Sequence, residues 1–526
     1  MKSHSENQPD SIEYYKNRCE ELERENEQLK RKVNWITEQA NLKQHQQFGS
    51  SSEKTDEAQM LLFNEAEAEQ DPLASEPKYE EITYTRKSRK GKKKKVKTDN
   101  LPVEEIEYRL PEEEQVCGCG HTLHEMSKET REELKIVPAQ AKVVKHHSYV
   151  YSCRNCEKND ITTPVITAKK PEPVIKGSLA SPSIVAHTMI QKYQNGMPLY
   201  RQEQEYNHLG INLSRQNLAN WVVKSAEKWL SPIYERLHSC LLGREVLQAD
   251  ETGVQVLKEP GRKAESTSYM WLYRTGGIDD LPIVLFDYQE TRARKHPQKF
   301  LEGFKGYLHV DAYAGYESIP DVTLVGCWSH ARRGFYNAFQ ALPPPERDKE
   351  VASKEGLEYC NQLFAIEREL KDKTPEERHR ERQARSRPVL DAFLVWLKTQ
   401  NEKALPKSYF GKAVHYCLKQ WHKLEAFMQD GRLEIDNNRS ERSIKPFITG
   451  RKNWLFSNTP AGAKASAVTY SIIETAKENG LNPFYYLNYL FETLPQVDIE
   501  DKDSLDKFLP WSEDLPESCK LPKSEK

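Results

Sequence analysis

Five short apolar runs follow one another between residues 245 and 328, and they constrain the fold more than any other feature of this chain. The runs are rich in β-branched and aromatic residues, a composition typical of β-strands. They read EVLQADETGVQVL, STSYMWLYRT, LPIVLFDY, GYLHVDAY and VTLVGCW. Residues 329–341 (SHARRGFYNAFQA) then give the first expected helix after the strands. This pattern predicts an α/β domain.

The α/β pattern is interrupted once. Residues 343–430 are helical in character, highly charged and without strand candidates, so we interpret them as an insertion. The pattern resumes with a helix around Glu441, the run RKNWLFS and two further helices. We therefore expect an α/β domain over 237–475 with a helical insertion at about 343–430, followed by C-terminal helices and a tail over 476–526. The last thirty or so residues are polar and punctuated by proline, and we expect them to be loosely ordered.

Three acidic residues stand out within this pattern. Asp250 (VLQADETGV) and Asp311 (GYLHVDAYAGY) close strand-like runs, and Glu441 (IDNNRSERSIKPF) lies in a later helical segment. A single aspartate at a strand end most often belongs to a turn. The order strand, strand, helix is instead how a ribonuclease H-like fold assembles a two-metal site, so we predict that these three carboxylates bind metal. Glu434 is the nearest alternative to Glu441.

Two Mg²⁺ or Mn²⁺ ions are the expected cofactors of such a site. Mg²⁺ prefers oxygen ligands in octahedral geometry and is usually held by a few carboxylates, waters and substrate phosphates. Two ions about 4 Å apart can activate an attacking water or 3′-hydroxyl and stabilise the leaving oxygen. The long stretch of chain between Asp311 and Glu441 includes the helical insertion, which explains their wide spacing in sequence. The expected chemistry is hydrolysis or transfer of phosphodiester bonds.

Basic residues surround Glu441 along its helix and beyond it. They are Arg439, Arg442, Lys445, Arg451 and Lys452. An acidic ligand within a basic surface suits a site that holds both a metal and a polyanion such as DNA. Arg442 is our candidate for supporting the reaction, although an ordinary Glu441–Lys445 pair one turn apart is also compatible with the pattern. Asn437 and Asn438 can cap this helix.

His330 lies in GCWSHARRGF, a segment that follows the Asp311 strand and begins the next helix. We expect His330 to contact the scissile phosphate or to assist proton transfer. A structural histidine is one alternative, and a metal contact shared with Cys327 is another.

The N-terminal segment 11–43, within an expected domain 1–48, carries a heptad pattern. Positions a are Ile12, Cys19, Asn26, Val33 and Ala40, and positions d are Tyr15, Leu22, Leu29 and Ile36. About four such heptads favour a leucine-zipper-like coiled coil, and Asn26 at an a position favours a parallel dimer. We therefore expect self-association through this coil. A lone amphipathic helix packed on the body of the protein is the alternative.

Residues 49–102 show no hydrophobic period and predict a disordered linker. Its segment 86–97 (RKSRKGKKKKVK) holds nine Lys or Arg residues, including Lys92, Lys93 and Lys94, and no acid. This polybasic tract should attract DNA phosphates without reading sequence. A linker that only keeps the chain soluble is equally compatible with its composition.

Residues 103–170 hold two pairs of cysteines. The pairs are Cys117/Cys119 and Cys153/Cys156. The segment between them, LKIVPAQAKVVKHHSYVYSC, alternates well enough to form a β-hairpin, which would gather the pairs into a four-thiolate Zn²⁺ site. The first pair is one residue tighter than the usual C-x-x-C, and His121 can replace one of its ligands. Two unrelated pairs of buried thiols are less compatible with a segment this small and polar.

Residues 181–236 have an all-helical pattern, within an expected helix-turn-helix DNA-binding region over 171–236. Within them, 197–229 read as helix, turn and helix, with the break at Leu209-Gly210-Ile211 and a cap for the second helix at Ser214. Three polar residues would then lie at the end of the second helix that meets base edges in a DNA-binding helix-turn-helix. They are Arg215, Gln216 and Asn217. A small helical bundle has similar spacing, so the preceding cysteine module adds weight to the DNA-binding interpretation.

Composition limits the class of protein. A chain of 526 residues is too long for one core and implies several domains. No apolar run approaches the ~20 residues that span a bilayer, and MKSHSENQPD lacks the features of a secretory signal, so we expect a cytoplasmic protein without a membrane partner. The net charge is −2, so DNA binding must rely on local basic segments. Ten cysteines in such a chain favour thiols or metal ligands over disulfides.

Taken together, these motifs resemble the insertion-sequence-66 family of DDE transposases. The matching segments are FGSSSEK, the cysteine pairs, YRQEQEYNHLGINLSRQNLANWV, ADET, HVDAYAGY, GCWSHARRGF and the block from DNNRSERSIKPF to NYLFETLP. The resemblance covers nearly the whole chain, and the C-terminal block is its most specific part. The family usually shows C-x-x-C where this chain has Cys117-Gly-Cys119.

The resemblance implies a DNA transposase that binds the terminal inverted repeats of its element and catalyses strand cleavage and strand transfer. Its DDE triad would fall on Asp250, Asp311 and Glu441. The implied order is a leucine-zipper-like segment, a zinc-binding β module, a helix-turn-helix, a ribonuclease H-like catalytic domain and a C-terminal cap. Small accessory proteins of the same element are implied as partners.

Two other functions are compatible with the same motifs. A domesticated DNA-binding regulator would keep the modules without the chemistry, although the intact triad argues against it. A structure-specific nuclease would use the same metal pair to cut without joining, and the N-terminal DNA-reading modules would then have little purpose.

Overall fold

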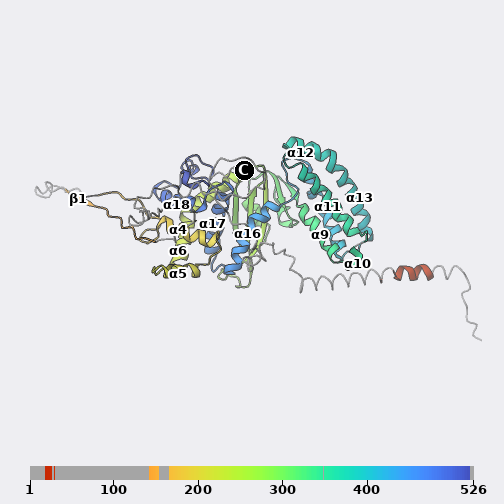
Figure 1. Cartoon of the computed structure of the whole chain (residues 1–526), viewed down its shortest axis with the longest axis horizontal. Helices are drawn as coiled ribbons and strands as arrows, with labels where there is room; N and C mark the ends of the chain where they lie inside the picture. The colour runs from red at the N-terminus through yellow and green to blue at the C-terminus, as the bar shows by residue number, and fades with distance from the viewer. Residues whose placement is uncertain (1–17, 27–28, 30–140, 153–164, 348, 522–526) are drawn as a thin grey trace, which may run out of the picture. The chain divides into compact units, whose positions relative to one another are not determined.

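The computed structural model describes residues 18–26, 29, 141–152, 165–347 and 349–521 (Figure 1). The chain divides into two compact units, 1–47 together with 146–526, and 48–145. Of the second unit only 141–145 are described, and they form neither helix nor strand. Among the described residues, no helix is both long enough and apolar enough to cross a bilayer.

Several predicted features lie wholly or partly outside the described residues. Residues 18–26 of the expected coiled coil are helical, and the side chains of Leu22 and Leu29 are exposed. Cys19 and Asn26 are also exposed, whereas the remaining heptad positions and the Lys92–Lys94 tract are not described. The same holds for the four predicted zinc ligands, Cys117, Cys119, Cys153 and Cys156.

The hairpin predicted between the two cysteine pairs is not the one observed. Strand β1 (Val150–Ser152) pairs antiparallel with β2 (Val165–Thr167), which follows the second cysteine pair. The preceding residues 141–149 form no strand. Alternation in the sequence identified one strand correctly but gave no information on its partner, which lies beyond the second cysteine pair and outside the alternating segment.

Five strands form at all five expected places and make one mixed sheet. They are β3 (Val246–Gln255), β4 (Thr267–Thr275), β5 (Val284–Gln289), β6 (Gly306–Val310) and β7 (Val322–Gly326). Their order in the sheet is β5-β4-β3-β6-β7. β3, β4 and β5 are antiparallel neighbours, whereas β6 and β7 run parallel to β3. The central strand β3 is thus flanked by an antiparallel and a parallel neighbour.

In the described chain, helices both precede and follow the strands of this sheet in sequence. Before the sheet come α4 (Pro182–Tyr193), α5 (Leu199–His208), α6 (Arg215–Ser225) and α7 (Ser231–Leu242). Short helix α8 (Lys295–Phe300) precedes β6, and α9 (Trp328–Gln340) follows β7. The last helices are α16 (Asn438–Trp454), α17 (Pro460–Glu478), α18 (Pro483–Thr493) and α19 (Lys502–Asp506). π-helical turns lie at Ala226–Leu230 and Arg382–Ser386.

Helix α17 protects the β5 edge of the sheet. β5 has a neighbour on one side only, and its outer backbone groups bond to hydroxyls of α17. The Thr475 hydroxyl accepts from Val284 N at 3.0 Å and donates to Val284 O at 2.9 Å, and Ser471 accepts from Phe286 N at 2.7 Å. Edge strands otherwise present unpaired backbone groups, so these bonds cover the edge that β5 would expose.

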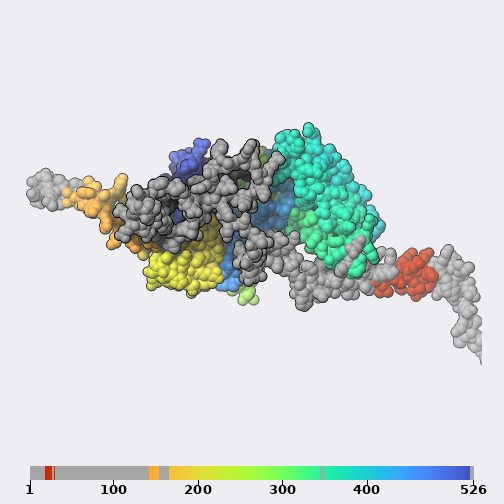
Figure 2. Space-filling view, in the orientation of Figure 1, coloured from red at the N-terminus to blue at the C-terminus, as the bar shows by residue number. Residues whose placement is uncertain are grey.

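The described residues between 344 and 425 form only helical elements, which gather in one lobe (Figure 2). Their helices are α10 (Pro344–Arg347), α11 (Ala352–Glu369), α12 (Pro375–Glu381), α13 (Arg387–Lys403), α14 (Tyr409–Lys419) and α15 (Trp421–Glu425). Trp328 and Phe335 of α9 join a hydrophobic cluster with Phe393 of α13, separate from the cluster beneath the rest of the sheet. The lobe therefore packs on α9, and its last helix, α15, contacts β7 directly.

One fully buried arginine ties this lobe to the segment that leads into α16. The Arg382 guanidinium pairs with both oxygens of Glu367, at 2.8 and 2.7 Å, and donates to Phe427 O and Leu433 O at 2.7 Å each. It also donates to Asp430 O at 3.0 Å. The backbone of 427–433 is therefore fixed from the interior of the lobe.

The C-terminal residues are packed rather than loosely ordered, so that prediction was wrong for 497–521. Apolar residues among the polar ones are buried against the core: Leu505, Phe508, Leu509, Leu515 and Cys519. The chain end also pairs with the loop before α18, since Asn482 N donates to Cys519 O and Leu521 N to Gly480 O. The prediction relied on average polarity, which hides a few well-placed apolar side chains.

Candidate active site

Asp250 and Asp311 lie side by side on neighbouring strands. β3 and β6 are parallel neighbours, and their register pairs Val246 with Tyr307 and Gln248 with His309. The same register, continued past Gln248 and His309, brings Asp250 opposite Asp311, at the spacing of about 4.8 Å between neighbouring strands. Asp311 follows the last residue of β6, as predicted, whereas Asp250 lies in the middle of β3, which continues to Gln255, so the prediction that Asp250 ends its strand was wrong.

Asp250 faces the helix that carries Glu441. Side chains alternate along a strand, so Gln248, Asp250 and Thr252 share one face of β3. That face is the one that α16 covers, because Ser440 bonds to Gln248 at 3.4 Å and Arg451 bonds to Thr252 at 3.4 Å. Glu441 is in the first turn of α16. The three predicted carboxylates are thus directed toward a common region.

Electrostatics support this proximity. Burial, together with the negative charges of Glu251, Asp311 and Glu441, raises the pKa of the Asp250 carboxyl to about 8. Carboxylates that repel one another in a buried place are stabilised by a divalent cation between them. The oxygen donors also match the preference of Mg²⁺ or Mn²⁺, so the residues present fit such ions.

Glu251, next to Asp250, has a different environment. Its carboxylate accepts from Arg292 Nε at 2.8 Å and from Tyr316 Oη at 2.6 Å. Arg292 also lies 3.8 Å from Asp311 and stacks on the ring of Tyr313 at 4.0 Å. The negative charge of Glu251 is therefore paired with Arg292 within the protein. The sequence analysis missed Arg292, since nothing in ETRARKHP distinguishes this arginine from its neighbour Arg294.

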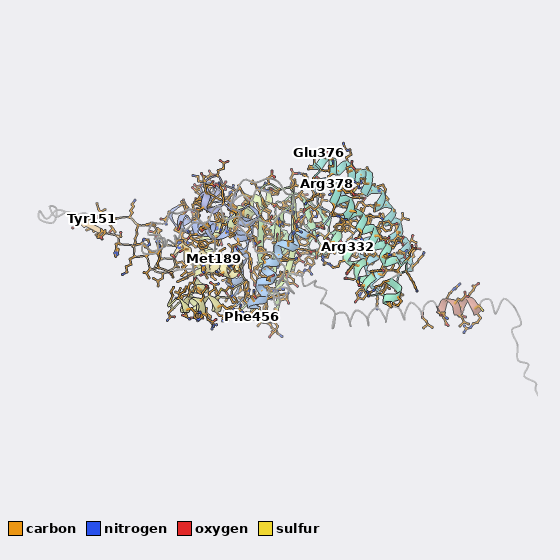
Figure 3. All side chains as sticks on the ribbon, in the orientation of Figure 1. Tyr151, Met189, Arg332, Glu376, Arg378 and Phe456 are labelled. Atoms are coloured by element: carbon orange, nitrogen blue, oxygen red, sulfur yellow. The ribbon has the colours of Figure 1, made fainter. Side chains whose placement is uncertain are left out.

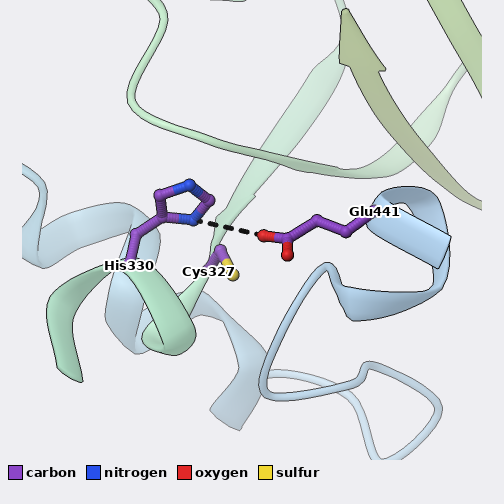
Figure 4. A group of neighbouring side chains, drawn as sticks. All are labelled: Cys327, His330 and Glu441. Carbon is purple, nitrogen blue, oxygen red and sulfur yellow. Dashed lines mark ion pairs between the residues drawn. The ribbon is translucent and has the colours of Figure 1, made fainter. Parts of the chain in front are cut away.

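Glu441 contacts α9 as well as facing the strands (Figure 4). His330 Nδ1 is 4.0 Å from one carboxylate oxygen, and Arg333 Nη2 is 3.7 Å from the other. Cys327 Sγ, His330 and Glu441 place ligand atoms within 4.8 Å of one another. His330 is thus at the predicted site, together with Cys327, whereas Arg333 was not anticipated.

Cys327 has a structural role in this group. Burial raises the pKa of its thiol to about 12, and its Sγ accepts a hydrogen bond from Asn437 N at 3.3 Å. This hydrogen bond links the end of β7 to the start of α16.

Asn437 does not cap α16 with its side chain, contrary to expectation. Its amide donates instead to Ala249 O at 2.8 Å, one residue before Asp250. Together with the bond to Cys327, this fixes the first turn of α16 to both β3 and β7. Asn438 is engaged with Asp436, to which its backbone N donates at 3.1 Å.

Glu434, the alternative to Glu441, is occupied by other partners. Arg439 Nε donates to it at 3.0 Å, and Gln248 donates to its other oxygen. Arg439 thus forms an ion pair with Glu434. Arg442 and Lys452 are exposed on α16, as is Lys445. Arg451 donates to Gly253 O and Thr252 Oγ1 on β3.

Helices α5 and α6 form the expected helix, turn and helix. Gly210 adopts φ +77° in the turn, and the Ser214 hydroxyl caps α6 by accepting from Asn217 N at 3.3 Å. Arg215, Gln216 and Asn217 are exposed at the start of α6. The Asn217 amide oxygen also accepts from the Ser214 hydroxyl at 2.8 Å. Arg215 and Gln216 therefore have the freer side chains.

Comparison with known proteins identifies the family of this chain. Residues 177–465 match the family described as Transposase IS66 family. The chain belongs to the IS66 transposase family. Residues 114–157 match the zinc-finger binding domain of transposase IS66, and 471–511 match the IS66 C-terminal element. Residues 35–106 match the description Transposase C of IS166 homeodomain.

Similar curated proteins come from Sinorhizobium fredii and carry no functional description. Uncharacterized protein y4jD is 31% identical over 418 residues, which cover 76% of this chain and 78% of the relative. Uncharacterized protein y4hP is 28% identical over 442 residues, covering 81% and 77% respectively. Membership of the family supports a transposase that has DNA as its partner and a divalent metal as cofactor. The zinc-finger match spans all four predicted cysteine ligands and supports Zn²⁺.

Proposed function

We propose that this protein is a DDE transposase that binds the terminal inverted repeats of its element and catalyses strand cleavage and strand transfer. One observation carries the proposal: Asp250 and Asp311 are equivalent in register on adjacent parallel strands, on the side toward Glu441. A mixed sheet with flanking helices is compatible with a ribonuclease H-like fold.

Asp250, Asp311 and Glu441 would hold two Mg²⁺ or Mn²⁺ ions, which, when bound, activate the attacking oxygen and stabilise the leaving oxygen. The residues of the chain then position the DNA. His330, beside Glu441, is placed to contact the scissile phosphate or to accept a proton. Arg442 and Lys445, exposed on the same helix, provide positive charge for the phosphodiester backbone, as do Arg451 and Lys452 further along.

The N-terminal modules would supply recognition and assembly. The exposed start of α6 reads base edges, and Lys92–Lys94 add attraction to phosphates. Four thiolates from Cys117, Cys119, Cys153 and Cys156 hold Zn²⁺. The coiled coil of 1–48 brings two copies together, and accessory proteins of the same element act with them. The proposed domains after the coiled coil are the linker 49–102, the zinc-binding module 103–170, the helix-turn-helix region 171–236, the catalytic domain 237–475, and the C-terminal helices and tail 476–526.

A strand-transfer assay tests this function. The full chain is incubated with labelled element ends, supercoiled target DNA and Mg²⁺, and products are separated by size. A transposase gives cleaved ends and joined products. Cleavage without joining would identify a nuclease instead, and binding without cleavage would identify a non-catalytic regulator.

A further inference from the structure

The turn after α16 has a strained backbone. Leu455 adopts φ 64° and ψ −46°, and Phe456 N donates to Trp454 O at 2.8 Å. These values describe a γ-turn of the rare type that side chains disfavour. Among the described residues other than glycine, Asp321 is the only other residue with a positive φ. Strain of this kind costs about 1–3 kcal/mol and persists where the surroundings enforce it.

The surroundings of the turn do enforce it. On one side, Leu455 N bonds to Arg451 O at 2.6 Å at the end of α16. On the other side, Ser457 N donates to Gln255 O at 2.9 Å, and Lys258 N donates to Asn458 O at 3.0 Å. The turn is therefore clamped between α16 and the end of β3. This arrangement presents two large apolar side chains to solvent.

Leu455 is 68% exposed and Phe456 is 42% exposed. Figure 3 labels Phe456 on the body of the molecule and Arg332 on α9. The preceding aromatic residue behaves differently: Trp454 packs against the Tyr193 ring at 6.4 Å, under the ammonium of Lys192 at 3.8 Å. Exposure of the next two side chains is thus a property of the strained turn.

The turn lies between the loop that enters α5 and the end of β3, the strand that carries Asp250. A Cβ on Gly196, in the loop that enters α5, would lie 2.7 Å from the Asn453 side chain. In the other direction, the stretch of β3 from Asp250 to Gln255 has a length of roughly 17 Å. That length equals about five nucleotide steps of duplex DNA. DNA held at both places would pass over the turn.

The charge around the turn suits DNA. Lys452 is exposed one turn before Leu455 on α16, whereas Lys192 lies over the Trp454 ring, where burial lowers its pKa to about 8. An exposed aromatic ring beside cations is the arrangement on which nucleic-acid bases stack. Leu and Phe are also residues that enter between base steps and unstack them.

We infer that Leu455 and Phe456 form a stacking wedge that contacts an unstacked base of the element-end DNA, about five nucleotides from the cleavage point. The inference rests on the proposed transposase function and deepens it. The ligand is a nucleobase, recognised by its face rather than by its hydrogen-bonding edge. A second copy of the chain covering the same apolar pair is the competing occupant.

The test places the fluorescent base 2-aminopurine, one position at a time, at the ten positions nearest the cleavage point of an element-end duplex. The full chain is added without divalent metal, so that no cleavage is required. Unstacking raises the fluorescence of this base. We expect a rise at one or two adjacent positions about five nucleotides from the cleavage point, and none elsewhere.

Variants distinguish the loss of the base contact from a folding defect. Phe456→Ala should abolish the rise and weaken end binding about 5- to 100-fold, whereas Phe456→Trp should retain both. Leu455→Gly removes the side chain but tolerates the positive φ, so the fold is kept while the rise falls. Tyr485→Ala, at an exposed aromatic residue on α18, is the matched control and should change neither.

The outcomes are distinguishable from a failure of the proposed function. Specific end binding with flat fluorescence at every position overturns the wedge alone. Loss of self-association in Phe456→Ala, with an unchanged fluorescence rise, assigns the apolar pair to a second copy and also overturns it. Absence of specific end binding by the unmodified chain removes the proposed function and the wedge with it.

Discussion

Asp250 and Asp311 hold equivalent positions on two adjacent parallel strands, because the register that pairs Gln248 of β3 with His309 of β6 also aligns the two aspartates. The third carboxylate, Glu441, comes from a helix whose first turn is fixed to the same sheet. Asn437 makes that connection through Ala249 O, and through the Cys327 thiol. The position of Glu441 relative to the two aspartates thus depends on Asn437, which carries no charge.

Asn437→Ala should lower DNA cleavage about 10- to 100-fold while leaving DNA binding largely intact, because small displacements of reacting groups cost this much. The Mg²⁺ concentration for half-maximal cleavage should rise as well, since Glu441 is less well placed. Asn438→Ala, one residue further on, is the control. Equal effects of both variants on cleavage and on thermal stability would argue for a general weakening of the helix start.

Thr475→Val should destabilise the protein by about 1–3 kcal/mol, because it leaves the backbone groups of Val284 buried without a partner. Thr469→Val is a matched control, since its buried hydroxyl bonds only to Ala465 O within α17. Chemical unfolding of the two variants measures the difference. A Thr469→Val variant as unstable as Thr475→Val would show that the β5 edge is not the source of the loss.

Asp287 on β5 should make stability depend on pH. Burial raises the pKa of its carboxyl from 3.8 to about 6. In the unfolded chain the proton is lost near pH 4, so the folded state binds the extra proton between about pH 4 and pH 6, and stability falls as pH rises through this window. Asp287→Asn should therefore stabilise the protein by about 1–3 kcal/mol at pH 7 and by nothing near pH 3.5. Unfolding measured across this range checks the sign, and a gain independent of pH would contradict it.

The double variant Arg215→Ala/Gln216→Ala should remove most of the preference for element ends over random DNA, since each base-edge contact discriminates by about 1–3 kcal/mol. Neutralising Lys92–Lys94 should weaken binding to both DNAs alike and reduce the slope against salt by up to about 0.9 per phosphate contact. Binding measured against ionic strength on both DNAs separates the two effects. The assignment is reversed if the lysines alter specificity and the α6 residues do not.

The sequence predicted the parts of the fold that have a local pattern. Apolar runs located all five strands, and the end of one run located Asp311 after β6, whereas Asp250 was expected at a strand end and lies within β3. Long-range partners were not predictable, because they leave no local trace: β1 pairs with β2 across the second cysteine pair, and Ser471 and Thr475 close the edge of β5.

Polar residues were the hardest to interpret in advance. Asn437 looks like an ordinary helix cap in the sequence, yet its amide bonds to β3. Glu251 and Asp250 are adjacent acids, and only alternation along β3 separates the one paired with Arg292 from the one facing α16. Such distinctions depend on which face of a strand is covered, and by what.

The most direct test of the triad compares Glu441→Gln with Glu434→Gln in Mg²⁺-dependent cleavage of element-end DNA. Glu434 already pairs with Arg439 and Gln248, whereas Glu441 faces the two aspartates and His330. We expect Glu441→Gln to bind DNA without cleaving it, as should Asp250→Asn and Asp311→Asn, and Glu434→Gln to cleave. Near-normal cleavage by Glu441→Gln, or its loss in a folded Glu434→Gln alone, would contradict the assignment of the triad.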